Sequence, residues 1–276
     1  MYVEYNKHLL YNSSSYYLEV IREKMNMKKK LIVFLGITFI LPLVCCLIMQ
    51  SFPIFRTGAA NLILYAIEGA SPTIAAIVVH CRGKEKGIGA FLSDKLWKQF
   101  SVKYCLIGFF TPAIVLTLGK AIVYFTMGTN EFFSPLSVKK ILIISWALVA
   151  EELGWRGFLQ DWLQEQCREV WIPLITGVIW ALWHYHFVIS GTMDIPYVAF
   201  LFGCVAESYG YYLITKASKG NVVPACIWHF SGNLFFNIYH INPEWNGGSM
   251  IPYWIINGIY LVYFLMFMLY QREEKE

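Results

Sequence analysis

The chain has 276 residues, of which 57% are hydrophobic and only 14% are charged, and its mean hydropathy is +0.50. Soluble domains carry about 25% charged residues, so this composition excludes a soluble globular enzyme and a disordered chain. The net charge of +4 is too small to indicate a nucleic-acid partner. The seven cysteines form no CxxC pair, which argues against a secreted disulfide scaffold. The composition predicts a polytopic membrane protein.

The N-terminus is polar and rich in Tyr and Ser. Met1–Lys24 lacks the basic-then-apolar order of a secretory signal peptide. Met25 and Met27 directly precede the basic cluster Lys28–Lys30, and either is a natural translation start. Residues 1–30 are therefore predicted to be a cytoplasmic tail, part of which is not translated if synthesis begins at Met25 or Met27.

A helix needs about 20 apolar residues to cross the hydrocarbon core. Seven stretches meet this requirement, and an eighth, Lys140–Gln160, is apolar only over its first half. In chain order the predicted spans are Leu31–Met49, Ala59–His80, Phe100–Met127, Lys140–Gln160, Val170–Ser190, Ile195–Ala217, Val222–Tyr239 and Ile251–Tyr270. They form one membrane domain, residues 31–270, followed by a cytoplasmic tail, residues 271–276. The predicted fold is all-α, with about eight transmembrane helices.

The basic residues decide whether Lys140–Gln160 is a span, because cytoplasmic connections carry an excess of Lys and Arg. If it spans, Arg168, Lys216 and Arg272 all fall on the same side as Lys28–Lys30; if it does not, they all fall outside. Eight spans with both termini in the cytoplasm is therefore the better account, and a bacterial plasma membrane is expected. Lys139 and Lys140 fall on the outer side and are the main exception.

Ionisable side chains inside spans cost roughly 2.5–3.5 kcal/mol each unless they are paired or face a cavity. The fourth span contains Glu151, Glu152 and Arg156. On a helix, Glu152 and Arg156 share one face, whereas Glu151 projects about 100° away from Glu152. One carboxylate can then be paired while the other accepts a proton. The alternative is a surface salt bridge at a helix end.

The fifth and seventh spans carry histidines. His184 lies deep in the fifth span, where a packed, hydrogen-bonded histidine is the alternative to a catalytic one. His186 points nearly away from His184 on a regular helix and could share its site only through a kink, so it is expected at the interface. His229 and Asn233 are four residues apart and share one face of the seventh span. The alternative here is an interhelical polar pair.

The ionisable residues of the fourth, fifth and seventh spans lie at depths in the membrane that allow them to meet. At 1.5 Å per residue, Glu151 lies ~17 Å from the outer end of its span, and His184 lies ~20 Å and His229 ~11 Å from the inner ends of theirs. The core is about 30 Å thick. The side chains are therefore predicted to face one polar cavity in the cytoplasmic half of the membrane.

Three motifs on three membrane helices resemble those of the CPBP intramembrane protease family. In chain order they are Glu-Glu-x-x-x-Arg, aromatic-x-x-x-His and His-x-x-x-Asn. That family includes the CAAX prenyl endopeptidase and proteins linked to bacteriocin processing and self-immunity. The first motif continues with Gly157-Phe158-Leu159, the second has Trp180 where the family often has Phe, and Asn221-Val222-Val223-Pro224-Ala225 precedes the third. The resemblance covers roughly residues 140–240, the protease-like core.

The resemblance implies proteolysis within or at the membrane. Glu151 and His184 would activate a water molecule, His229 and Asn233 would stabilise the oxyanion, and Arg156 would hold Glu152. Family members are often labelled metalloproteases, and Glu151, His184 and His229 would then be the Zn²⁺ ligands. Because Arg156 places a cation beside the carboxylates and no His-Glu-x-x-His is present, metal-free water activation is favoured, with no cofactor.

Two other functions are compatible with the sequence. A binding or immunity protein on the same fold would hold a peptide in the polar cavity without cutting it. A proton-coupled transporter would use Glu68, Glu207 and the histidines as a relay, although no repeated halves are found. The expected partners are the lipid bilayer and a peptide or membrane-protein substrate, bacteriocin-like rather than prenylated. Glu68 and Glu207 lie outside the motifs, and the sequence assigns them either to the cavity or to helix contacts.

Overall fold

The computed structural model describes residues 2–81, 87–128 and 131–273, and the side chains within them except those of 2–26, 263 and 265–273. The basic residues Arg82, Lys84 and Lys86, the role of the tail Met1–Lys24 and the last residues 274–276 lie outside the described side chains. Helices account for all regular structure in the described ranges. The all-α prediction is therefore confirmed.

The helices differ widely in length. They are α1 (Tyr2–Ser51), α2 (Gly58–Gly69), α3 (Ser71–Cys81), α4 (Ile88–Leu92), α5 (Val102–Met127), α6 (Val138–Ala150), α7 (Glu152–Gly154), α8 (Gln160–Gln164), α9 (Trp171–Trp183), α10 (Tyr185–Ser190), α11 (Tyr197–Ala217), α12 (Val223–Ile238) and α13 (Ile251–Glu273). Short 3₁₀-helices are η1 (Pro53–Phe55) and η4 (Pro243–Asn246), and π-helical turns are η2 (Ser93–Trp97) and η3 (Trp155–Leu159).

Within the described residues, four helical segments are long and apolar enough to cross a membrane. They are Met27–Ser51, Val102–Met127, Trp171–Ser190 and Tyr197–Ala217. The pair α2 and α3, bent by 61°, makes a fifth if it is counted as one span. The helices α6 and α12 are shorter, with 13 and 16 residues. A membrane protein is confirmed, whereas the count of eight spans is not.

Small residues let the central helices approach one another closely. A Cβ atom on Gly108 of α5 would lie 2.4 Å from the carbonyl oxygen of Pro224 on α12. A Cβ atom on Gly177 of α9 would lie 2.7 Å from the Cα atom of Val205 on α11. The helices α5, α9, α11 and α12 therefore pack backbone against backbone, which fixes the positions of the histidines on α9 and α12.

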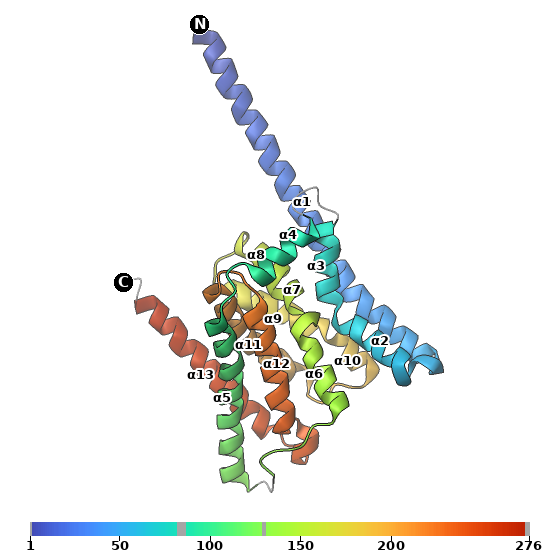
Figure 1. Ribbon diagram of the computed structural model, residues 1–276. Helices are drawn as coiled ribbons and strands as arrows, with labels where there is room; N and C mark the ends of the chain where they lie inside the picture. Colours follow the sequence, from blue (N-terminus) through green and yellow to red (C-terminus); the bar gives the residue numbers. More distant parts are fainter. Residues whose placement is uncertain (1, 82–86, 129–130, 274–276) are drawn as a thin grey trace.

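The connections sort into two ends of the bundle (Figure 1). One end, here called the basic end, holds the end of α13 and the connections that carry Lys95, Arg168 and Lys216, and α1 extends beyond it. The opposite end holds the α5–α6, α10–α11 and α12–α13 connections. This arrangement agrees with the alternation of basic residues along the sequence, and the assignment of the basic end to the cytoplasm stays a prediction.

Three helix breaks lie at ionisable residues. Glu151 leaves the helical conformation between α6 and α7, with φ −120° and ψ −40°. His184 separates α9 from α10, with φ −71° and ψ 6°. The third break separates α2 from α3 just after Glu68. The expected continuous helix over Lys140–Gln160 is therefore wrong in detail, since α6 ends at Ala150 and the π-helix η3 follows α7.

Candidate active site

One cavity of about 520 Å³ lies within the bundle, and residues of α2, α5, α6, α9, α10, α11, α12 and α13 line it. Its carboxylate, lysine, histidine and amide lining residues are Glu68, Lys140, Glu151, His184, His186, Asp194, Glu207, His229, Asn233, Asn237, Asn242 and Asn257. Four of the six predicted site residues, Glu151, His184, His229 and Asn233, share this cavity. Glu152 and Arg156 lie behind its wall and are buried.

Glu151 is anchored by two tryptophans. Its Oε2 atom accepts the indole N–H of Trp180 at 2.8 Å and that of Trp155 at 3.2 Å. Its Oε1 atom lies 3.9 Å from Nε2 of His229. The break at Glu151 turns this carboxylate toward the cavity while the next residue, Glu152, points into the protein. The prediction that the two neighbouring carboxylates face different partners agrees with these contacts.

Glu152 bridges Arg156 and His229. The Arg156 guanidinium lies 3.0 Å from Glu152 Oε2, which agrees with the pairing predicted from their spacing. Glu152 Oε1 lies 2.8 Å from Nδ1 of His229. Because a carboxylate can only accept, Nδ1 of His229 carries the hydrogen and donates it. Glu152 therefore orients His229, and its sequence spacing gave no signal of this contact between α7 and α12.

Arg156 is also stacked on aromatic rings. Its guanidinium carbon lies 3.9 Å from the centroid of the Tyr211 ring and 5.2 Å from that of Trp180. Only 1% of Arg156 is exposed. A planar guanidinium suits this position, because it pairs with a carboxylate at its edge and with an aromatic ring at its face. Tyr211 is a supporting residue that the motif search missed.

His184 lies at the break between α9 and α10, and only one of its two ring nitrogens, Nδ1, is used in a hydrogen bond to the described part of the protein. Its Nδ1 atom lies 2.8 Å from the carbonyl oxygen of Trp180, so Nδ1 donates a hydrogen to that carbonyl. A neutral His184 then has its lone pair on Nε2. Trp180, which the second motif includes, thus contacts both Glu151 and His184, through its indole and its carbonyl.

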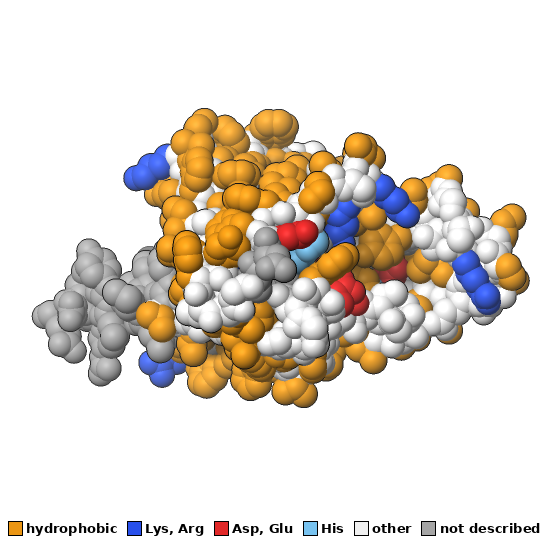
Figure 2. Space-filling model, turned by 90° about the horizontal axis from the view of Figure 1, so that it is seen from below, with side chains coloured by type: hydrophobic (Ala, Val, Ile, Leu, Met, Phe, Trp, Pro, Cys, Tyr) orange, Lys and Arg blue, Asp and Glu red, His pale blue; other side chains and the backbone are white. Residues whose placement is uncertain are grey.

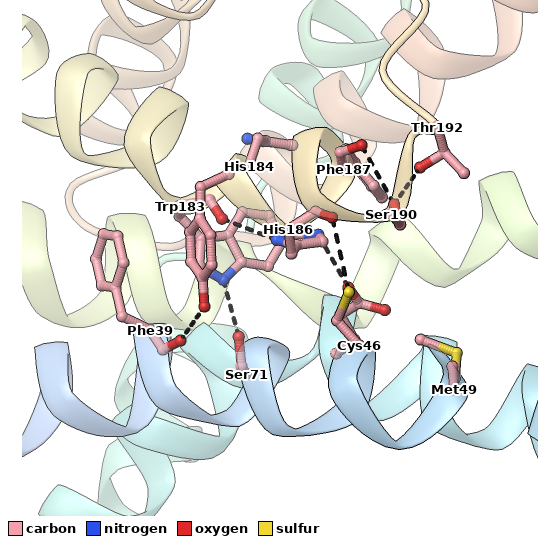
Figure 3. A network of polar contacts seen from close by, with 12 residues as sticks. Phe39, Cys46, Met49, Ser71, Trp183, His184, His186, Phe187, Ser190 and Thr192 are labelled. Carbon is pink, nitrogen blue, oxygen red and sulfur yellow. Dashed lines mark hydrogen bonds and ion pairs between the residues drawn. The ribbon is translucent and has the colours of Figure 1, made fainter. Parts of the chain in front are cut away.

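The prediction that His186 lies at the interface is wrong. His186 is 1% exposed, lines the cavity and stacks beside His184, with ring centroids 6.0 Å apart and planes within 17°. The break at His184 supplies the kink that a regular helix lacks. Figure 3 shows both histidines above α1, where Trp183 donates its indole N–H to Ser71 and the Cys46 thiol contacts the His186 carbonyl.

Glu68 pairs with His186 across the cavity wall. Its Oε1 atom lies 3.5 Å from Nε2 of His186, and Glu68 is 3% exposed. Both roles that the sequence left open for Glu68, cavity lining and a helix contact, are therefore observed. Glu207 also lines the cavity. Glu68 could have been singled out from the sequence, because it directly precedes Gly69-Ala70-Ser71-Pro72, a sequence that favours a break in a helix.

Lys120 is a buried cation that the sequence analysis passed over. It lies on α5, is 5% exposed, and donates from Nζ to the carbonyl oxygen of Tyr239 at 3.1 Å. Tyr239 is the C-terminal cap of α12, where the helix carbonyls lack partners and favour a positive charge. Lys120 therefore stabilises the end of the helix that carries His229 and Asn233.

The donor set does not fit a metal ion in this arrangement. Among the side chains that the structure describes, no group of three or more His, Cys, Asp or Glu residues is placed to hold one. The contacts of Glu151 Oε2 with two indoles and of His229 Nδ1 with Glu152 leave Glu151 Oε1 and Nε2 of His229 and His184 as the remaining donors, and these are not placed as one three-ligand group. The ligand set Glu151, His184 and His229 considered from the sequence is therefore not assembled here.

The cavity extends toward the opposite end of the bundle. Lys140 at the start of α6, Asp194 in the α10–α11 connection and Asn242 in the α12–α13 connection line it there. Viewed from that end, the surface is hollowed and charged side chains gather near its middle (Figure 2). The location of this cavity in the cytoplasmic half of the membrane stays a prediction, because helix depth locates residues along a span but does not tell which way their side chains open.

The fold and the cavity thus define a helical membrane protein with a buried glutamate-and-histidine centre. A family model described as type II CAAX prenyl endopeptidase Rce1-like matches residues 134–235, which contain all three motifs. Over 125 residues the chain is 26% identical to the protein of Methanococcus maripaludis named CAAX prenyl protease 2. Residues 134–235 are thus similar to the CPBP family of CAAX-type intramembrane proteases. The match covers 42% of this chain and 46% of that relative.

Proposed function

We propose that the chain is an intramembrane endopeptidase that hydrolyses a peptide bond of a membrane-associated or lipidated peptide or protein. The observation that carries this proposal is the convergence of Glu151, His184, His229 and Asn233 on one cavity, from three separate helical segments. The match of residues 134–235 to a CAAX-type endopeptidase family supports the same reaction class.

Glu151 and His184 act on the attacking water. Glu151 Oε2 is held by two indoles, which leaves Oε1 as the acceptor for a water proton. The lone pair on Nε2 of a neutral His184 provides the second acceptor that orients the water. The water oxygen attacks the scissile carbonyl carbon, and Glu151 takes up the proton. General base catalysis of this kind contributes typically 10²–10⁴-fold.

His229 and Asn233 bind the oxygen that becomes negative. Nδ1 of His229 donates to Glu152, so a second proton on Nε2 makes a cation that the Glu152 carboxylate stabilises. That cation and the Asn233 amide stabilise the oxyanion, at about 2.7–4 kcal/mol for a single donor in a soluble protease. The carbon–nitrogen bond then breaks, and the leaving amine takes the proton held by Glu151. Arg156 pairs with Glu152 in a buried salt bridge and so holds it in place beside His229.

The substrate is a peptide segment that reaches membrane depth. Apolar rings such as Trp180, Phe200 and Phe236 line the cavity beside the ionisable groups, so the site accepts an apolar or lipid-bearing segment next to the scissile bond. The relative from Methanococcus maripaludis is named for prenyl proteins. Both a prenylated C-terminal peptide and an unmodified bacteriocin-like peptide are therefore to be tested as substrates.

The test compares the peptides in membranes that contain the wild type or Glu151→Gln. The substitution keeps the side-chain shape and removes the base, so one cleavage product should disappear or fall by about 10²–10⁴ in rate. His80→Ala is the control: His80 lies on α3, donates to its own helix at Ala76 and does not line the cavity. Identical peptide profiles for wild type and Glu151→Gln would refute proteolysis. Retained peptide binding without cleavage would identify a binding or immunity protein.

A further inference from the structure

Two histidine side chains stabilise the break between α9 and α10. The backbone N–H groups of His184 and Phe187 bond to carbonyls three residues back in the chain, at 3.1 and 3.0 Å. A regular α-helix would use the carbonyls four residues back, which are those of Trp180 and Trp183. Here imidazoles donate to these two carbonyls, Nδ1 of His184 to Trp180 and Nδ1 of His186 to Trp183, both at 2.8 Å. Each histidine is thereby fixed with a hydrogen on Nδ1, because a carbonyl can only accept.

The other ring nitrogen of His186 faces Glu68. Nε2 of His186 lies 3.5 Å from Oε1 of Glu68, and both side chains are buried. With Nδ1 as the donor, a neutral His186 has a lone pair on Nε2, and an ionised Glu68 also offers only acceptors. Two acceptors that face each other away from water are unfavourable. The pair therefore holds one additional proton, on Nε2 of His186 or on Glu68, and in both forms it carries no net charge, which burial favours.

Contacts on both sides of His184 join the break to the bend between α2 and α3. Directly before His184, Trp183 donates its indole N–H to Oγ of Ser71 at 2.9 Å, as Figure 3 shows. Two residues after it, His186 meets Glu68. The ring of His184 stacks beside that of His186, with the centroids 6.0 Å apart and the planes within 17°. The α2–α3 bend therefore sets how α10 turns from α9, and with it the direction of the His184 ring.

We propose that Glu68 and His186 are positioning residues for His184. Through the break, they hold His184 with its hydrogen on Nδ1 and its lone pair on Nε2, directed into the cavity. They act through His184 and take no part in bond making. The need is for a hydrogen-bonding partner at Oε1 of Glu68 and not for a charge there. The role of His184 toward water rests on the proposed function, whereas its tautomer and the shape of the break are independent of catalysis.

Two substitutions of Glu68 test the positioning by kinetics. Glu68→Leu removes the partner of His186, so kcat for the Glu151-dependent product should fall by up to about 10²-fold, as for other small displacements of a catalytic group, while KM changes little. Glu68→Gln should keep the wild-type kcat, because its amide N–H donates to Nε2 of His186. Ser218→Ala is the control: it removes two buried hydrogen bonds away from the cavity and should lower the melting midpoint without lowering kcat. A wild-type kcat in Glu68→Leu, or a Glu68→Gln variant as slow as Glu68→Leu, overturns the proposal.

Nitrogen-15 NMR of labelled histidines in detergent-solubilised protein reads the tautomer without a substrate. The His184 signals, assigned by their absence from His184→Ala, should show a hydrogen on Nδ1 in the wild type and in Glu68→Gln, and exchange between tautomers in Glu68→Leu. A mixture of tautomers in the wild type overturns the proposal even if Glu68→Leu does not fold. If the tautomers behave as expected but no product depends on Glu151, the proposed protease function fails while the positioning of His184 stands.

Discussion

Arg156 shows how much a single buried charge can depend on its neighbours. It pairs with Glu152, stacks on Tyr211 and has almost no exposed surface. Glu152 in turn orients His229. A buried ion pair gives little net stability compared with apolar residues, but removing one partner leaves the other charge uncompensated. Arg156 and Glu152 therefore act as one unit that positions His229.

Arg156→Ala should consequently reduce folding as well as catalysis. It leaves the Glu152 carboxylate, 0% exposed, without its cation, and breaking a buried pair in this way costs about 3–5 kcal/mol. We expect a lower yield of monodisperse protein in detergent and a lower midpoint of thermal unfolding. Glu151→Gln, which keeps its two indole contacts, is the comparison and should melt like the wild type. Equal melting of Arg156→Ala and the wild type would contradict this account.

We expect that activity does not depend on a bound metal ion, and this expectation rests on individual side chains. Since the described side chains provide no three-ligand group, purified active enzyme should contain substoichiometric metal and keep its activity in the presence of a chelator. Elemental analysis before and after chelation measures this directly. Stoichiometric zinc that is lost with activity and restores it on readdition would make Glu151, His184 and His229 ligands, and His184→Ala would then release the metal.

At the scale of elements, broken helices place the ionisable groups. Glu151 and His184 sit at the breaks themselves, and Glu68 lies just before the third. The contacts Trp183 to Ser71 and His186 to Glu68 join two of these breaks. Such interruptions are tolerated inside a membrane where the freed backbone groups are satisfied by neighbouring helices or line a cavity. The helix breaks and the cavity therefore depend on each other.

Close packing of α7 on α3 holds the break at Glu151 in place. A Cβ atom on Gly154 would lie 2.4 Å from the carbonyl carbon of Pro72. Gly154→Ala should therefore force α7 away from α3 at a cost of about 1–3 kcal/mol, and both the melting midpoint and the activity should fall. Gly36→Ala is the matched control, because nothing lies within 4 Å of the added methyl group on α1. If both variants melt alike, the contact does not hold the break.

At the scale of the molecule, α1 begins and α13 ends on the side of the basic end (Figure 1). An even number of membrane crossings produces this arrangement, which suits the eight spans inferred from the sequence, although only four to five helical segments within the described residues meet the length and hydropathy required. Short helices such as α6 fall below that length because the chain bends at Glu151. The count of eight spans therefore stays a prediction.

Removing the N-terminal tail should leave insertion and activity intact. A chain that begins at Met25 keeps the basic cluster Lys28–Lys30, which orients the first span. Membrane fractionation and the Glu151-dependent product measure the two outcomes separately. Loss of insertion on truncation would show that residues 1–24 are a required part of the protein.

The sequence by itself determined the all-α membrane class, the three motifs and the Glu152–Arg156 pair. Each of these depends on composition or on spacing along one helix, and both are local properties. Only the tertiary structure decided that Glu152 orients His229, that His186 turns inward to meet Glu68, and that the cavity opens away from the basic end. These features arise where one helix breaks against another, and the partner that fixes a break is far away in the chain.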